Sequence, residues 1–143
     1  MKSYKFLDDV AIADIAFEAE ADSLNGVFIA CGEAVFETIS DVEKVDKIKV
    51  YDISLKSDTL EKLLYDFLET IVYYKDTDSV VFNSCEVKIE EKDNNFLLKG
   101  KIYGEYINRN KHELYSDVKA ITMHMFKLEK KGDNYKATVV LDI

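Results

Sequence analysis

The chain has 143 residues, with 28 Asp and Glu against 19 Lys and Arg, which gives a formal net charge of -9 at pH 7. This charge repels a phosphate backbone over the whole molecular field, so we expect no direct binding of nucleic acid. Hydrophobic residues make up 48% and charged residues 33% of the chain, a balance that excludes wholesale disorder. Because the sequence contains no proline and therefore no Pro-rich linker, we interpret residues 1–143 as a single domain.

The sequence shows no signal for export or membrane insertion. Its first ten residues, MKSYKFLDDV, place two aspartates where a signal peptide needs an apolar segment. No apolar run approaches the roughly 18 residues of a membrane span, so we predict a cytoplasmic protein. The two cysteines, Cys31 and Cys85, are too few for a disulfide scaffold and are expected to be buried free thiols.

The first half of the chain predicts two strand-helix units. Alternating apolar and polar residues indicate a half-buried strand over residues 12–19. Capping residues then precede an amphipathic helix over residues 24–41. The apolar parity slips by one position within residues 48–55, which indicates a strand with a bulge. Apolar residues at helical spacing over 60–72 form the second helix.

Strand periodicity dominates the second half. Alternation with period two predicts four strands, over residues 80–91, 96–106, 119–129 and 135–143. Asn-containing turns after the first and third of these strands are typical of hairpins. Gly100 and Gly104, inside the second of them, indicate a bulge or a close backbone approach.

These elements predict an α+β fold in the order β-α-β-α-β-β-β-β. Each helix has one apolar side and must bury it against another layer. We therefore expect both helices to pack on one face of a mixed, largely antiparallel sheet. The polar stretch 108–117 is expected to form a longer loop.

The standard catalytic and nucleotide-binding motifs are missing. The sequence contains no GxGxxG, no P-loop, no GxSxG and no HExxH. His112 stands between charged residues and is expected to be solvated, whereas His124 lies in an apolar strand and is interpreted as a hydrogen-bonded structural residue. Met123, Met125 and Phe126, beside it, are expected in the core.

The last two residues of the sequence form an acidic tip. Alternation in the final strand directs Asp142 away from the apolar face, and the α-carboxylate of Ile143 follows within one peptide. Two hard oxygen ligands side by side, joined by a third carboxylate, would favour a cation such as Ca²⁺ or Mg²⁺. The residues alone leave the third ligand open, and a solvated acidic terminus is the alternative.

Several segments together resemble the archease family, in matching order and spacing over essentially the whole chain. They are ADIAF at 13–17, DSL at 22–24, LLYDFL at 63–68, VKAITMH at 118–124 and VLDI at 140–143. Many members carry His-Thr where this chain has Ala11 and Ile12, so no role for those two residues can be transferred.

The resemblance implies a protein cofactor of the RtcB-type RNA ligase in tRNA splicing, which is not itself an enzyme. It implies that the protein promotes metal- and GTP-dependent guanylylation of the ligase and its multiple turnover, and broadens its nucleotide use. The functional aspartates of the family fall on Asp14 and Asp142, and its lysine falls on Lys119. Lys119 has two open roles, an ion pair with the aspartates or a contact to a phosphate.

The same resemblance supplies the missing ligand. Asp14, Asp142 and the carboxylate of Ile143 would hold one divalent metal ion, Ca²⁺ in a crystal and Mg²⁺ or Mn²⁺ in function. Two rival readings are a metal-dependent hydrolase of a small phosphorylated substrate and a calcium-stabilised, chaperone-like interaction module.

Overall fold

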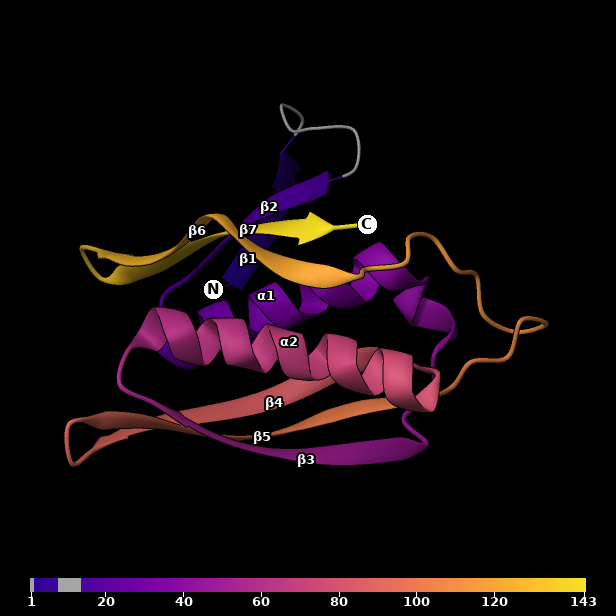
Figure 1. Cartoon of the computed structure of the whole chain (residues 1–143), viewed down its shortest axis with the longest axis horizontal. Coiled ribbons are helices and arrows are strands. Elements are labelled where there is room, and N and C mark those ends of the chain that lie inside the picture. Colours follow the sequence, from indigo (N-terminus) through magenta and orange to yellow (C-terminus); the bar gives the residue numbers. More distant parts are fainter. Residues whose placement is uncertain (1, 8–13) are drawn as a thin grey trace.

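Two antiparallel sheets enclose a layer of two helices (Figure 1). The computed structural model describes residues 2–7 and 14–143. The four-stranded sheet has the order β1-β2-β7-β6, with β1 Lys2–Leu7, β2 Asp14–Ala21, β7 Asn134–Asp142 and β6 Ala120–Lys131. The three-stranded sheet has the order β3-β5-β4, with β3 Lys49–Ser57, β5 Asn95–Tyr106 and β4 Val80–Lys92. Between the sheets lie α1 Leu24–Ile39 and α2 Leu60–Asp78, and the short 3-10 helix η1 Val42–Lys44 follows α1.

The predicted α+β class and element order are confirmed, but the layering differs from the prediction. The helices lie between two sheets instead of on one face of one sheet, and every pairing in the described residues is antiparallel. An additional strand, β1, pairs with β2. The reason for the second sheet lies in α1, which has buried residues on almost every side and so needs cover from both directions.

Aromatic side chains tie the helices to each other and to both sheets. The rings of Phe28 in α1 and Phe67 in α2 lie 6.0 Å apart. Phe36 of α1 contacts Phe82 of β4 at 5.7 Å, and both are almost fully buried. Burial of each such ring contributes roughly 1.5–3 kcal/mol, so these contacts fix the helix layer firmly.

Smaller features agree with the sequence. The Ser23 hydroxyl caps α1 by accepting a hydrogen bond from the Gly26 N–H at 3.0 Å. Cys31 and Cys85 are buried free thiols, and burial raises the pKa of Cys85 to about 12. No helix among the described residues combines the length and apolar character needed to cross a membrane.

The prediction of a bulge within residues 48–55, which belong to β3, is wrong. β3 pairs with β5 in unbroken register. The apolar residues that suggested a slip, Ile48 and Val50, are instead 70% and 50% exposed. The irregularity lies in β4, between Phe82 and Ser84, opposite Gly104 of β5. A Cβ at Gly104 would lie 1.9 Å from the carbonyl oxygen of Val81, so the close approach inferred for this glycine is present.

A larger irregularity interrupts β6. Thr122 pairs with Val140 and Lys127 with Thr138, so four residues of β6 face one residue of β7. The prediction that Met123 and Met125 lie in the core is wrong, because they are 67% and 48% exposed.

His124, between these methionines, is exposed as well, and its expected structural hydrogen bond is not among those of the described residues. Met125 has a positive φ of 57°. Only Phe126, at the end of the bulge, turns inward, and its ring lies 5.7 Å from that of Tyr65 on α2.

Candidate functional site

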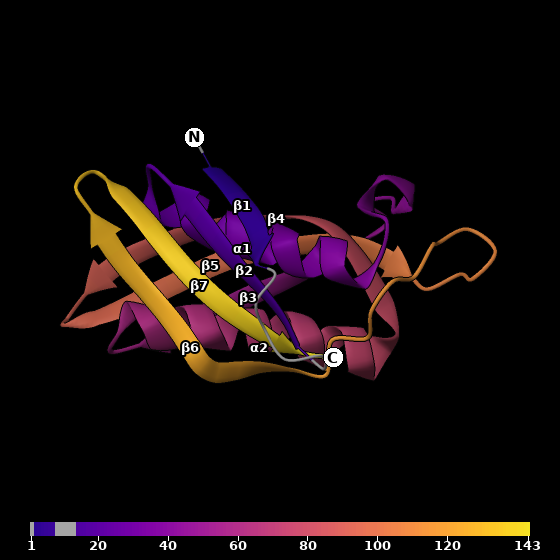
Figure 2. The ribbon, with the colours of Figure 1, turned by 90° about the horizontal axis from the view of Figure 1, so that it is seen from above.

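The four-stranded sheet brings together the two aspartates predicted from opposite ends of the chain. β7 lies between β2 and β6, and Asp14 of β2 is the direct register partner of Asp142 of β7 (Figure 2). On the other side of β7, Ala120 of β6 pairs with the same Asp142. The three residues therefore form one row across the end of the sheet.

This row points away from the helices. Phe17 on β2, Leu141 on β7 and Ile121 on β6 belong to the core between the sheets. Alternation then places Asp14, Asp142 and Ala120 on the outer face, where the two aspartates are partly exposed. Ala120 presents only a methyl group, so the side chain of this strand partner leaves space beside Asp142.

Two carboxylates directly opposite each other are an unfavourable pair. Cβ atoms of such cross-strand partners lie about 4.5–5.5 Å apart, and like charges at this separation repel. A bound cation or a nearby ammonium offsets this repulsion because it attracts both carboxylates. The register thus creates a place where positive charge is stabilising.

Lys119 lies next to this row but outside the strand. β6 begins at Ala120, so the alternation that would turn Lys119 toward the core does not apply to it. Its backbone N–H donates to the carbonyl oxygen of Asp142 at 2.8 Å, which fixes its position at the tip. The exposed ammonium makes no salt bridge with an acid of the described residues, such as the pair of Asp14 and Asp142.

A further polar group on this face was missed by the sequence analysis. Thr122, two residues after Ala120 and on the same face, has a buried hydroxyl oxygen without a hydrogen-bond partner among the described residues. Its row neighbours, Ala16 and Val140, are both fully buried, although they lie outside the core between the sheets. The sequence offered one signal for Thr122, because alternation along the strand places it on the same face as Ala120.

The donor set fits a hard divalent cation. Asp14 and Asp142 offer carboxylate oxygens, and Thr122 offers a hydroxyl oxygen that has no hydrogen-bond partner among the described residues. These are oxygen ligands of the kind that Ca²⁺, Mg²⁺ and Mn²⁺ prefer. No cluster of three or more His, Cys, Asp or Glu side chains in the described part of the chain is placed to hold a metal. A third carboxylate must come from another group, and that of Ile143 stays the prediction.

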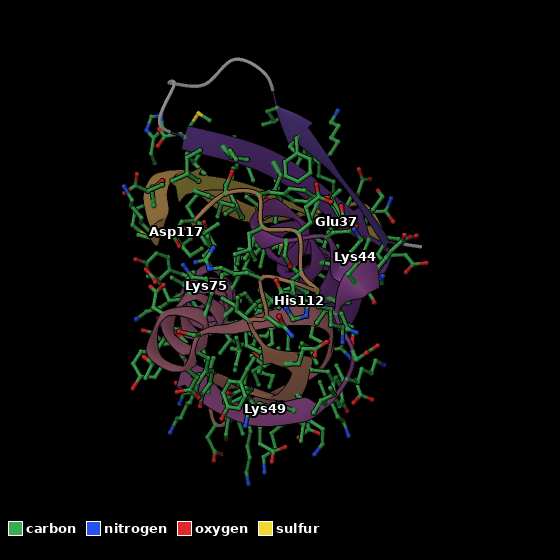
Figure 3. All side chains as sticks on the ribbon, turned by 90° about the vertical axis from the view of Figure 1, so that its right-hand side faces the viewer. Glu37, Lys44, Lys49, Lys75, His112 and Asp117 are labelled. Carbon is green, nitrogen blue, oxygen red and sulfur yellow. The ribbon has the colours of Figure 1, made fainter. Side chains whose placement is uncertain are left out.

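A buried lysine anchors the segment that leads to the site. Lys75, near the end of α2, is only 6% exposed, and its ammonium donates to Asp117 at 2.6 Å and to the carbonyl oxygen of Val118 at 2.7 Å. Asp76 is a third partner at 2.7 Å. Figure 3 shows Lys75 and Asp117 pointing toward each other. Because Val118 precedes Lys119, Lys75 holds the approach to the site.

A second polar cluster corrects the prediction for His112. Its side chain is buried, not solvated, because the loop after β5 folds back on itself. His112 Nδ1 accepts from the N–H of Asn108 at 2.9 Å, and Nε2 lies 3.2 Å from Glu105.

Glu105 is the centre of that cluster. It accepts from the Asp46 N–H at 2.6 Å and from the Lys111 ammonium at 2.7 Å. Burial acts to raise the pKa of Glu105, but the hydrogen bonds from Lys111 and Asp46 outweigh it and lower the pKa to about 2. Glu105 is therefore an ionised carboxylate, and its contacts with Lys111 and His112 hold the loop after β5 in place.

Comparison with known proteins shows the family to which this chain belongs. Residues 4–143 match the model of the Archease protein family. The chain belongs to the archease family. It is 42% identical over 132 residues to the protein archease of Pyrococcus furiosus, covering 92% of this chain and 93% of the relative. It is 37% identical over 143 residues to the protein archease of Sulfurisphaera tokodaii, covering all of both chains.

Solved structures share the archease fold. The solution structure of Methanobacterium thermoautotrophicum protein 1598 matches with a TM-score of 0.86 and 34% identity, covering 98% of each chain. The crystal structure of a Thermotoga maritima archease, described as a possible chaperone, matches with a TM-score of 0.60 and 20% identity over 93% of each chain. At that identity the likeness concerns the fold alone. The departure at residues 11 and 12 lies outside the described residues.

We predict that Lys75→Met destabilises this archease by about 2 kcal/mol. The change leaves the buried Val118 carbonyl oxygen without its donor, whereas the Asp117 carboxylate is 73% exposed and is solvated by water once the ion pair is lost. Urea unfolding followed by circular dichroism measures the loss. Lys62→Met, which removes an exposed lysine of the same helix, is the matched control and should change stability by less than about 0.5 kcal/mol. Equal losses of stability in the two variants would contradict the anchoring role of Lys75.

The low pKa of Glu105 predicts a specific pH dependence. A carboxyl group whose pKa falls from 4.5 to about 2 on folding stabilises the native state above pH 4.5 and loses that contribution as the pH drops toward 2. The difference in unfolding free energy between wild type and Glu105→Gln should therefore be largest near pH 6 and shrink steadily below pH 4.5. Urea unfolding at several pH values tests this, and a difference that stays constant with pH would refute it.

Proposed function

We propose that this archease activates an RtcB-type RNA ligase as a protein cofactor without catalysing ligation itself. In this proposal it promotes metal- and GTP-dependent guanylylation of the ligase in tRNA splicing, supports multiple turnover and broadens nucleotide use. The observation that carries the proposal is the direct pairing of Asp14 with Asp142, the two aspartates on which the family resemblance falls. Membership of the archease family supports it further.

The proposed mechanism uses the outer face of the sheet tip. Asp14 and Asp142 would hold a divalent cation and carry it to the active site of the ligase. A bound Mg²⁺ or Mn²⁺ would neutralise triphosphate charge during nucleotidyl transfer. The described tip already holds Lys119 beside Asp142 through its backbone hydrogen bond. Its ammonium makes no salt bridge within the described residues and is suited to contact a phosphate oxygen held by the ligase.

The overall charge is consistent with a protein partner. A net charge of -9 disfavours direct contact with RNA, but it steers the protein toward a basic surface. In this proposal the ligase binds the RNA and the archease binds the ligase.

We predict that Asp14→Asn and Asp142→Asn each abolish most of the stimulation of ligase guanylylation, by at least about tenfold. Each change removes one carboxylate of the pair while keeping the shape of the side chain. Asp133→Asn, in the exposed turn between β6 and β7, removes the same charge and should leave stimulation unchanged. The measurement is incorporation of labelled GMP into the cognate ligase.

Calorimetric titration of Mn²⁺ into the same variants separates metal binding from ligase activation. Full stimulation by Asp14→Asn or Asp142→Asn would sink the proposed function. Unchanged Mn²⁺ affinity combined with lost stimulation would remove the metal role but keep the aspartates as activating residues.

The exposed bulge of β6 favours a second candidate, a chaperone-like interaction module. Met123 and Met125 are flexible apolar side chains that stand out from the sheet, and such methionines suit binding of many partners. The likeness to the Thermotoga maritima protein, described as a possible chaperone, is compatible with this candidate.

This second candidate predicts that the protein suppresses aggregation of reduced, unfolded lysozyme, and that Met123→Lys with Met125→Lys removes most of the effect. Light scattering measures aggregation, and Lys127→Met, which adds an apolar residue just beyond the bulge, controls for nonspecific changes. Suppression that is absent in the wild type, or unchanged in the double variant, would eliminate this candidate.

A further inference from the structure

An acidic hollow of about 300 Å³ lies at the end of α1, and the proposed function does not use it. It is lined by Glu37, Ser40, Asp41, Val42, Glu43 and Tyr115. In Figure 3, Glu37 and Lys44 mark this part of the surface, across the view from Lys75 and Asp117. The hollow therefore lies away from the lysine anchor but on the same end of the molecule.

Backbone hydrogen bonds build the hollow from two distant segments. The N–H of Ser40 ends α1 by donating to the carbonyl oxygen of Phe36 at 3.1 Å. Asp41 then donates to the carbonyl oxygen of Glu113 at 3.0 Å, and Tyr115 donates back to Ile39 at 2.9 Å. These bonds run along both sides of the hollow, so its walls are fixed before any ligand binds.

The hollow concentrates negative charge with little compensation. Glu37, Asp41 and Glu43 line it, and Glu113 lies close enough to act on Tyr115. Burial first, and then the charges of these acids, raise the pKa of Tyr115. Among the described residues the salt bridge at this place joins Lys44 and Glu113 at 3.7 Å, and both side chains are more than half exposed. Such a pair offsets little of the local field.

Two of the acids also have local contacts that leave their charge in place. Asp41 accepts from the N–H of Glu43 at 3.1 Å, and Glu37 interacts with the hydroxyl of Tyr4. Neither contact supplies a positive charge. The carboxylates of the hollow therefore retain the capacity to bind a cation.

Ser40 gives an independent indication of a ligand. This residue is 1% exposed, and its hydroxyl oxygen has no hydrogen-bond partner among the described residues. A buried hydroxyl without a partner carries a free-energy cost of about 1–3 kcal/mol. Because Ser40 lines the hollow, a ligand donor entering there is the means by which the structure can satisfy it.

We infer that this hollow receives an arginine or lysine side chain from a basic protein partner. Three carboxylates match the several N–H donors of a guanidinium or ammonium group. The ring of Tyr115, 56% exposed at the rim, adds a face on which a cation can stack.

The inference deepens the proposed function and rests on it only for the identity of the partner. The chain runs from Tyr115 through Asp117, held by Lys75, to Lys119 at the sheet tip. A ligase bound at the tip is therefore positioned to place a basic residue in the hollow. The hollow would supply affinity, and the aspartate pair would supply activation.

The first test uses a tetra-arginine peptide as the probe, in an NMR titration of the labelled protein. Saturable shifts at the amides of Ser40, Asp41 and Tyr115 are expected. They should disappear in the double variant Glu37→Gln, Glu43→Gln and persist in Glu90→Gln, Glu91→Gln, which removes the same charge from the exposed end of β4. Shifts spread evenly over the acidic surface, or equal in both variants, would overturn the inference.

The second test measures affinity for the cognate ligase by calorimetry. The variant Glu37→Gln, Glu43→Gln should bind about tenfold more weakly and with a reduced salt dependence, whereas Glu90→Gln, Glu91→Gln should bind within twofold of wild type. Unchanged affinity of the hollow variant would overturn the inference. Asp14→Asn should bind the ligase normally but fail to activate it. If the wild type does not bind the ligase at all, the proposed function is contradicted. The peptide titration still tests the hollow in that case, because it does not involve the ligase.

Discussion

The register of β7 between β2 and β6 is the constraint on which the candidate site depends. Phe17, Leu141 and Ile121 face the helices, and their burial sets how the three strands align. A slip of one residue would turn Leu141 to solvent and drive Asp142 against the helix layer. Packing of the core therefore decides that Asp14 and Asp142 meet on the outer face, although the two residues come from opposite ends of the chain.

The helix layer also fixes the position of Lys119, the third predicted residue of the site. α2 packs against β6 and against the three-stranded sheet, and its last turn carries Lys75. The buried ammonium of Lys75 grips Asp117 and Val118 just before the strand begins. Lys119 is thus positioned from both sides, by α2 through Lys75 and by β7 through the carbonyl of Asp142. The exposed polar tip is held by buried groups.

Sequence periodicity predicted most elements but not their layering. Apolar spacing placed the hairpin strands β4–β5 and β6–β7 within two residues of their ends, and it placed the start of α2 correctly but ended that helix six residues early, at 72 instead of 78. It did not reveal β1, because this edge strand leaves Phe6 45% exposed and has no clean apolar face. The second sheet was also hidden, since a helix pattern shows how much of a helix is buried but not what covers it.

The candidate site was predictable in part. Alternation alone directed Asp142 outward, whereas Asp14 entered only through the family resemblance, because strand pairing over such a sequence separation leaves no local signal. The burial of Lys75 and His112 was not predicted, for a related reason. Each is a polar residue whose partners come from distant segments, so burial could not be foreseen from neighbours in the sequence. The bulge in β6 likewise exposed methionines that alternation had assigned to the core.

We propose that Asp14 and Asp142 jointly hold one cation at the sheet tip. Paramagnetic broadening of amide signals by substoichiometric Mn²⁺ provides the test. If the two aspartates share the ion, the amides of Asp14, Lys119 and Asp142, on three different strands or their ends, broaden first and together. Broadening that begins instead at the acidic hollow near Glu37, or that spreads evenly over the acidic surface, would contradict it.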